Sequence, residues 1–85
     1  MNQIEMKNVH SSQITSIGYD QDLEVLYVEF RNSNVYRYMD VPKEIYEQFM
    51  NNDSVGSYFH THIKDEYEYE KLNMLVNNNR LELEN

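Results

Sequence analysis

The apolar run Leu23–Phe30 constrains the fold of this chain more than any other segment. It is rich in β-branched and aromatic residues, which favour a strand. Successive side chains of a strand point to opposite faces, so Leu26 and Phe30 share one face while Tyr27 lies on the other. Because both faces carry apolar groups, this strand is predicted to lie in the centre of a sheet.

Two further strands are predicted beside this central one. Residues 14–19 precede a polar turn, and residues 35–39 follow the turn Arg31–Asn34. Asparagine tolerates a positive φ, which hairpin turns often require, so we expect residues 35–39 to return antiparallel. The three segments predict a small antiparallel sheet of about three or more strands.

Two short helices are predicted after the strands. Pro42 suits the first turn of a helix, and Ile45 and Phe49 are spaced to share its buried face. Ser54 is expected to cap a second helix that runs to about residue 63. The predicted class is therefore α+β, in the order β-β-β-α-α, with both helices packed on one face of the sheet.

The predicted core combines the inward positions of the strands with the apolar stripes of the helices. The residues expected to be mostly buried are Ile17, Leu26, Val28, Phe30, Ile45, Phe49, Phe59 and Ile63.

Residues 70–85 are predicted to form a polar C-terminal extension of a domain that spans residues 9–69. Apolar residues at helical spacing around Leu75 allow a short helix, which Asn77–Asn79 would end. Residues 80–84 alternate like an edge strand, or form a loose tail. Because the apolar residues of this extension have no obvious place in so small a core, a protein-interaction or homo-oligomer assembly module is an alternative function.

Size and charge restrict the ligands that such a chain can bind. A chain of 85 residues predicts one domain with one core, so a ligand site would be a surface groove, a sheet face or an oligomer seam. Seven Lys+Arg against 15 Asp+Glu give a net charge of −8. This charge opposes non-specific DNA binding and docking on an anionic membrane, but not binding of a compact ligand or a protein.

Cysteine usage and the first residues indicate the compartment. The chain has no cysteine, and residues 1–7 show neither an apolar run nor a basic leader. We therefore expect a cytoplasmic protein with no membrane association. The many asparagines are typical of A/T-rich genomes, such as those of low-GC bacteria and their phages.

Several short motifs follow one another in a fixed order. They are Ser11-Ser12, Ile17-Gly18-Tyr19-Asp20, Leu26-x-Val28-x-Phe30, Val35-Tyr36-Arg37-Tyr38-x-x-Val41-Pro42, Ser54-x-Gly56-x-Tyr58-Phe59 and Ile63-Lys64-x-x-Tyr67. Together they resemble the KTSC family, a small domain that occurs alone and at the C-terminus of some lysyl-tRNA synthetases. The resemblance implies a domain for which RNA binding has been suggested and no catalytic residues are assigned.

This chain departs from the family pattern at two places. Members often carry basic residues around position 57 and in the segment after Ile63, whereas this chain has Ser57 at the first place and Asp65 and Glu66 at the second. The departure favours a compact nucleotide over a long RNA.

Tyr36, Arg37 and Tyr38 are the first candidate ligand-binding residues. The two tyrosines share a strand face and can stack on bases, whereas Arg37 points to the opposite face. Alternatively, the tyrosines pack under the helices with their hydroxyls at the rim. Arg31 and Lys43 add positive charge nearby, which predicts either an anion site or ordinary surface charge paired with acidic neighbours.

Ser54, Gly56 and Ser57 are a second candidate, for binding phosphate at the start of a helix. Free N–H groups at a helix N-terminus suit an anion, and glycine permits close backbone approach. In the alternative interpretation Asp53 caps the helix, and Gly56 lets the helix pack closely on the sheet.

Metal binding and catalysis receive little support. Among His60, His62, Asp65 and Glu66, the spacing places His62 and Glu66 alone on one helix face, and two ligands make a poor site. The serines beside His10 lack the geometry of an activated nucleophile, and no glycine-rich phosphate loop is present. The sequence therefore predicts a non-enzymatic binding module without metal or cofactor. Its predicted ligand is a compact nucleotide-type molecule or a short RNA element.

Overall fold

The computed structural model describes residues 3–83, so the last two residues of the predicted C-terminal extension lie outside it. The strands are β1 (Gln3–Glu5), β2 (Lys7–Asn8), β3 (Ile14–Asp20), β4 (Val25–Phe30), β5 (Val35–Tyr38), β6 (Tyr69–Leu72) and β7 (Arg80–Glu82). The helical elements are α1 (Lys43–Met50), α2 (Val55–Tyr58) and a π-helical turn, η1 (Phe59–Ile63), that continues α2.

Five strands form one antiparallel sheet in the order β2-β3-β4-β5-β6. The predicted central position of β4 is confirmed, since β3 and β5 flank it on either side. Its strand begins at Val25 rather than Leu23, because Glu24 takes a positive φ of 56° in the preceding turn. In the next turn Ser33 adopts the positive φ, at 74°, rather than either flanking asparagine.

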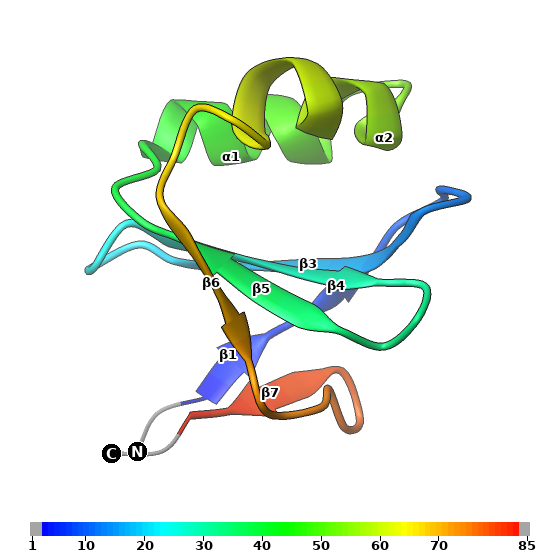
Figure 1. Ribbon diagram of the computed structural model, residues 1–85, viewed down its shortest axis with the longest axis vertical. Helices are drawn as coiled ribbons and strands as arrows, with labels where there is room; N and C mark the ends of the chain where they lie inside the picture. Colours follow the sequence, from blue (N-terminus) through cyan, green and yellow to red (C-terminus); the bar gives the residue numbers. More distant parts are fainter. Residues whose placement is uncertain (1–2, 84–85) are drawn as a thin grey trace.

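The molecule has three layers (Figure 1). The helices α1 and α2 cover one face of the five-stranded sheet, as predicted. The opposite face carries a separate two-stranded sheet of β1 and β7, which the prediction lacked. We call β1, β7 and the connecting residues 73–79 the terminal layer. No helix within residues 3–83 is both long and apolar enough to cross a membrane.

The core between sheet and helices contains most of the residues predicted to be buried. Those that are buried are Ile17, Leu26, Val28, Phe49, Phe59 and Ile63. Phe30 and Ile45 are half-buried and pack against the same cluster. The helix boundaries also follow the predicted signals: Pro42 occupies the N-cap of α1, and the Ser57 N–H donates to the Ser54 hydroxyl at the start of α2.

A second core lies between the sheet and the terminal layer. Its buried members are Ile4, Met6, Val25, Tyr27, Val35 and Leu81. Five half-buried apolar residues pack around them: Met39, Leu72, Met74, Val76 and Leu83. The apolar residues of the C-terminal extension thus have an intramolecular place, apart from Leu75, which stays 69% exposed.

Close approach of β1 to the sheet depends on Gly18. A Cβ atom at this position would lie 2.6 Å from Ile4 Cγ2 and from Met6 Sδ, and 2.8 Å from the Glu5 carbonyl oxygen. Contacts that short force something to move, and one of them is to backbone. The N-terminal strand can therefore cross β3 at this distance because residue 18 has no side chain.

The segment after residue 67 differs most from the prediction. The short helix expected around Leu75 is wrong, because Leu72 ends strand β6 and residues 73–76 hold no helix. Asn78 and Asn79 then turn the chain with φ values of 54° and 59°. The edge-strand interpretation of the following residues is confirmed for Arg80–Glu82, which pair antiparallel with Gln3–Glu5.

Candidate functional site

An open groove of about 590 Å³ lies between the β4–β5 end of the sheet and the helical segment that leads to β6. Its lining residues are Gln13, Phe30, Arg31, Asn32, Asn34, Tyr36, Tyr38, Phe59, Lys64, Asp65 and Tyr69. Because five of them are aromatic, we call it the aromatic groove. Its volume falls in the range of pockets that hold small ligands.

The rings of the groove form a connected set. The Phe30 ring meets Tyr36 edge-on at a centroid distance of 5.6 Å and Phe59 at 5.3 Å. The Phe59 ring also meets Tyr38 edge-on at 5.7 Å. Edge-to-face contacts of this kind favour particular orientations of the rings.

Strand register explains why these rings gather. Tyr36 and Tyr38 alternate onto the helix side of β5, and β6 pairs with β5 so that Tyr69 lies opposite Tyr38. The Tyr69 ring lies 5.9 Å from that of Tyr36 and 5.8 Å from that of Tyr38, and Tyr69 is 61% exposed. Tyr69 thus forms an accessible wall over rings that are otherwise more buried.

The tyrosine pair was expected either to bind a ligand or to pack in the core, and the two tyrosines differ in this respect. Tyr38 is 4% exposed and belongs to the core, whereas Tyr36 is half-buried at its edge. Burial, and then the neighbouring hydroxyls of Tyr36 and Tyr69, raise the pKa of Tyr38. Its hydroxyl is therefore neutral at physiological pH and able to donate a hydrogen bond.

Positive charge reaches the groove from two layers of the molecule. Arg31 follows β4, and its Nε and Nη2 atoms donate to the Ser11 carbonyl oxygen at 3.1 and 2.8 Å. Lys64 follows η1 in the helical layer, and its side chain is exposed.

Arg37 lies on the opposite face of the sheet, as its position in the strand predicted. It donates from Nε and Nη2 to Glu70 Oε1 at 2.9 and 2.6 Å. This carboxylate is the main cause of the raised pKa of Arg37. The guanidinium is thus neutralised within the fold and lies away from the aromatic groove.

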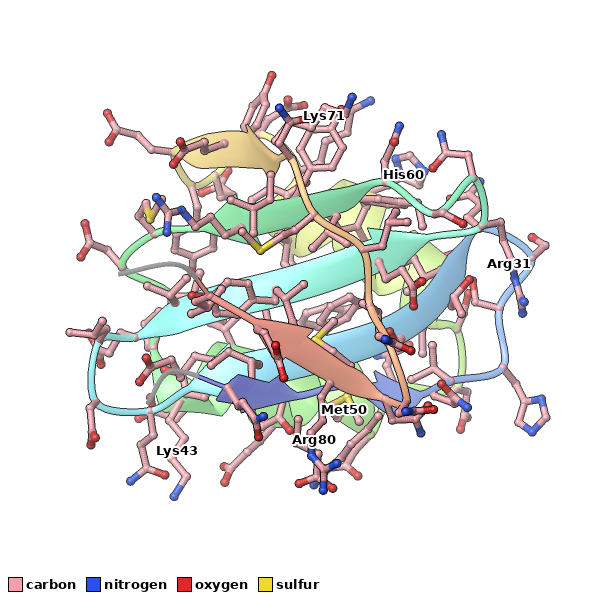
Figure 2. The ribbon with its side chains drawn as sticks, turned by 90° about the horizontal axis from the view of Figure 1, so that it is seen from below. Arg31, Lys43, Met50, His60, Lys71 and Arg80 are labelled. Carbon is pink, nitrogen blue, oxygen red and sulfur yellow. The ribbon has the colours of Figure 1, made fainter. Side chains whose placement is uncertain are left out.

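Lys43 is also separate from the groove. It begins α1 and lies 4.0 Å from Glu47, one turn further along the helix. Figure 2 shows Lys43 and Arg31 well apart. The structure therefore brings Tyr36, Tyr38 and Arg31 together and places Arg37 and Lys43 elsewhere.

The second candidate site, at Ser54, Gly56 and Ser57, is occupied by its own cap. The Ser57 N–H donates to Ser54 Oγ at 3.4 Å, so one of the free donors is satisfied. A Cβ atom on Gly56 would meet the side chains of Gln13 and Ser11 at 3.6 Å, an ordinary contact. Gly56 is therefore not required for close packing, and the helix that it belongs to has four residues.

The candidate metal ligands do not converge. Within residues 3–83 there is no group of three or more His, Cys, Asp or Glu side chains that could hold a metal ion. The His62 ring packs on Tyr58 at a centroid distance of 4.5 Å. His60 instead contacts Gln13, with its Nε2 atom 3.0 Å from Gln13 Oε1.

Eight groove residues were not predicted as site residues: Gln13, Phe30, Asn32, Asn34, Phe59, Lys64, Asp65 and Tyr69. Tyr69 carries a usable signal, because Tyr67 and Tyr69 alternate with Glu66, Glu68 and Glu70 as in a strand. Phe59 appeared as core and is indeed buried. Gln13 and Lys64 reach the groove from a loop and a helix end, and no local pattern marks such positions.

Comparison with known proteins agrees with this architecture of a small α+β domain. A family model described as the KTSC domain matches residues 10–67. The chain therefore belongs to the KTSC domain family, as the sequence motifs indicated. The matched region contains the sheet strands β3 to β5 and all the helical elements, and it ends before β6.

Relatives fall into two kinds. An uncharacterized protein of Stutzerimonas stutzeri strain A1501 is 38% identical over 64 residues, which cover 73% of this chain and 90% of that protein. The lysine–tRNA ligase of Trichormus variabilis is 38% identical over 61 residues, 72% of this chain but 11% of the ligase. The same domain thus occurs in small proteins and as a small part of a large enzyme.

A solved structure shows the same fold. The crystal structure of a KTSC domain protein from Yersinia pestis matches with a TM-score of 0.79 and 36% identity. The match covers 97% of that chain but 81% of this one. Nearly all of the neighbour is therefore represented here, whereas this chain carries additional residues.

Proposed function

We propose that the aromatic groove binds a nucleotide unit, either free or within a short RNA element, without catalysing a reaction. The observation that carries the proposal is the convergence of five aromatic rings with Arg31 and Lys64 on one open groove. A base requires flat apolar faces, and its phosphate requires cationic donors on the rim.

Two sources of the nucleotide unit share this chemistry. The lysine–tRNA ligases among the relatives act on tRNA, which supports RNA as the source. The net charge of −8 supports a compact source, because each additional phosphate meets an acidic surface. The groove is thus proposed to take one base and its adjoining phosphate, whichever molecule carries them.

The hypothesis of assembly through residues 70–85 rested on apolar residues without a place in the core. Leu72, Val76 and Leu81 are now accounted for, because they pack within the second core. The groove is therefore the stronger basis for a function.

The test compares groove variants with matched controls in calorimetric titrations at low salt. The ligands are nucleoside 5′-monophosphates and single-stranded hexaribonucleotides. Tyr69→Ala is expected to weaken binding by about 1–3 kcal/mol, or roughly 5- to 150-fold in Kd, because an exposed stacking ring is lost. Leu75→Ala, which removes another exposed apolar side chain, should leave Kd unchanged.

The cationic rim is tested in the same way. Arg31→Ala should weaken binding and reduce the salt dependence, whereas Lys43→Ala, remote from the groove, should do neither. Tighter binding of hexaribonucleotides with a steeper salt slope would identify RNA as the source. Equal affinity of all four variants and the wild type, or no binding by either ligand class, would refute the proposal.

A further inference from the structure

Gln13 occupies an unusual position on the wall of the aromatic groove, because three hydrogen bonds fix it. Its backbone N–H donates to Ser11 Oγ at 3.1 Å, and its carbonyl oxygen accepts from the Arg31 N–H at 2.9 Å. Its side-chain Oε1 lies 3.0 Å from His60 Nε2. A side chain held at both its backbone and its end has little freedom to change orientation.

The contact with His60 determines which end of the Gln13 carboxamide remains available. A carboxamide oxygen can accept a hydrogen bond but cannot donate one, so Nε2 of His60 must carry the proton in this contact. Within residues 3–83, the Gln13 Nε2 amide donates to no other group. The oxygen of this groove-lining side chain is thus engaged by His60, whereas its amide keeps two N–H donors available for a ligand.

We propose that Gln13, positioned by His60, makes the aromatic groove selective for bases with a keto group over bases with an amino group. This inference rests on the proposed function. Uracil carries a carbonyl oxygen at the ring position where cytosine carries an amino group, and guanine differs from adenine in the same way. The fixed N–H donors can bind the keto oxygen, whereas an amino group in their place would leave two donors facing each other.

Asp65 is the competing candidate for reading the base, since it also lines the groove. Its carboxylate accepts hydrogen bonds and would favour the amino bases, which is the opposite selectivity. Asp65 is exposed and next to Lys64 in sequence, and no hydrogen bond fixes its carboxylate among the described residues. Gln13 is therefore the better-positioned reader, and the sign of the selectivity distinguishes the two residues.

The test measures the ratio of Kd for CMP to Kd for UMP, with AMP and GMP as a second pair. Each variant is also titrated with hexacytidylate and hexauridylate, so that an RNA source is covered. The wild type is expected to prefer UMP by about tenfold, the contribution of one hydrogen bond made or lost. Gln13→Glu should reverse the preference, because its carboxylate accepts from the amino group of cytosine.

Three further variants separate selectivity from general effects. Gln21→Glu introduces the same charge change in an exposed turn and should leave the ratio unchanged. His60→Ala should bring the ratio close to one while the protein still binds UMP, because the released carboxamide can present either end. Asp65→Asn should also leave the ratio unchanged.

Each outcome bears on the inference. A preference for UMP that Gln13→Glu reverses supports the inference. Loss of the preference in His60→Ala, with the ratio unchanged in Gln21→Glu and Asp65→Asn, supports it as well. Equal affinity for all four nucleotides overturns the proposed selectivity while leaving the proposed function intact. A CMP-to-UMP ratio of Kd that changes in Asp65→Asn but not in Gln13→Glu has the same consequence. Absence of any nucleotide or oligonucleotide binding overturns both.

Discussion

The two faces of the central sheet are covered in different ways. The helix side is built from one continuous stretch, from Ile14 to Ile63, and it leaves the aromatic groove open at its edge. The terminal side is covered by β1 and β7, which come from opposite ends of the chain and pair with each other. The family match, residues 10–67, contains the first region and excludes both of these strands. The comparison indicates that the matched domain supplies most of the groove, with Tyr69 of β6 just beyond the match, and that β1 and β7 supply an added layer behind it.

The largest expected effect is on the helix side. Phe49→Ala removes a fully buried ring that stacks on Tyr58 and does not line the groove. The expected loss is about 3–5 kcal/mol, which is a large part of the stability of a domain of this size. Urea unfolding followed by circular dichroism measures it. A loss below about 1 kcal/mol would show that this cluster is not the main core.

Leu81→Ala tests whether the terminal layer is part of the same cooperative structure. Leu81 is fully buried against the back of the sheet, so its truncation should cost about 2–5 kcal/mol. Leu75→Ala is the control, because that side chain is 69% exposed and its loss should have almost no effect. Equal stability of the two variants would mean that the terminal layer contributes little and is separable from the domain.

Gly18→Ala and Gly56→Ala each add one methyl group, the first beneath β1 on the terminal side and the second in α2 on the helix side. The methyl group on residue 18 would overlap Ile4, Met6 and the backbone of β1, so we expect a loss of about 1–3 kcal/mol. The methyl group on residue 56 has room and improves helix propensity, so stability should hold or rise by up to about 1 kcal/mol. Chemical denaturation of both variants gives the answer, and the reverse order of stabilities would contradict the packing described for β1.

The smallest effect concerns alkaline pH. Burial raises the pKa of Tyr38 in the folded protein above the value of about 10 that tyrosine has in an unfolded chain. The stabilisation is therefore fully present below about pH 10 and is lost as the pH rises towards the folded pKa, at no more than about 1.4 kcal/mol per pH unit. Tyr38→Phe should flatten this decline in denaturation series between pH 9 and 12. Parallel curves for the variant and the wild type would be inconsistent with a buried Tyr38 hydroxyl.

The difference between the two faces also explains what the sequence could predict. Leu26 and Phe30 mark β4 through strand alternation, and Ile45 and Phe49 mark α1 through helical spacing. Each of these signals lies within a few residues, and the contacts that they predict are formed. Tyr36, Tyr38 and Arg31 could likewise be grouped, because they lie on neighbouring strand positions and the adjoining turn.

The terminal layer has no comparable local signal. β1 contains one buried residue, Ile4, which is too little for an alternating pattern. Its partner lies at the other end of the chain, where Gln3 donates to Glu82 across a separation of 79 residues. Because pairing over such a distance depends on the shape of the whole sheet, the apolar residues near Leu81 looked like an exposed tail when considered locally. The same limitation hid Gln13 and Lys64, which reach the groove from a loop and a helix end.

The most direct test of this account is a titration of the isotopically labelled wild-type protein with UMP at low salt, followed by ¹H–¹⁵N correlation spectra. The account predicts that the largest shift changes map to the groove, at Gln13, Arg31, Tyr36, Lys64 and Tyr69. The terminal layer, represented by Ile4 and Leu81, should remain unchanged. Shift changes concentrated in the terminal layer, or none at millimolar UMP or with hexauridylate, would contradict the claim that the aromatic groove is the functional site.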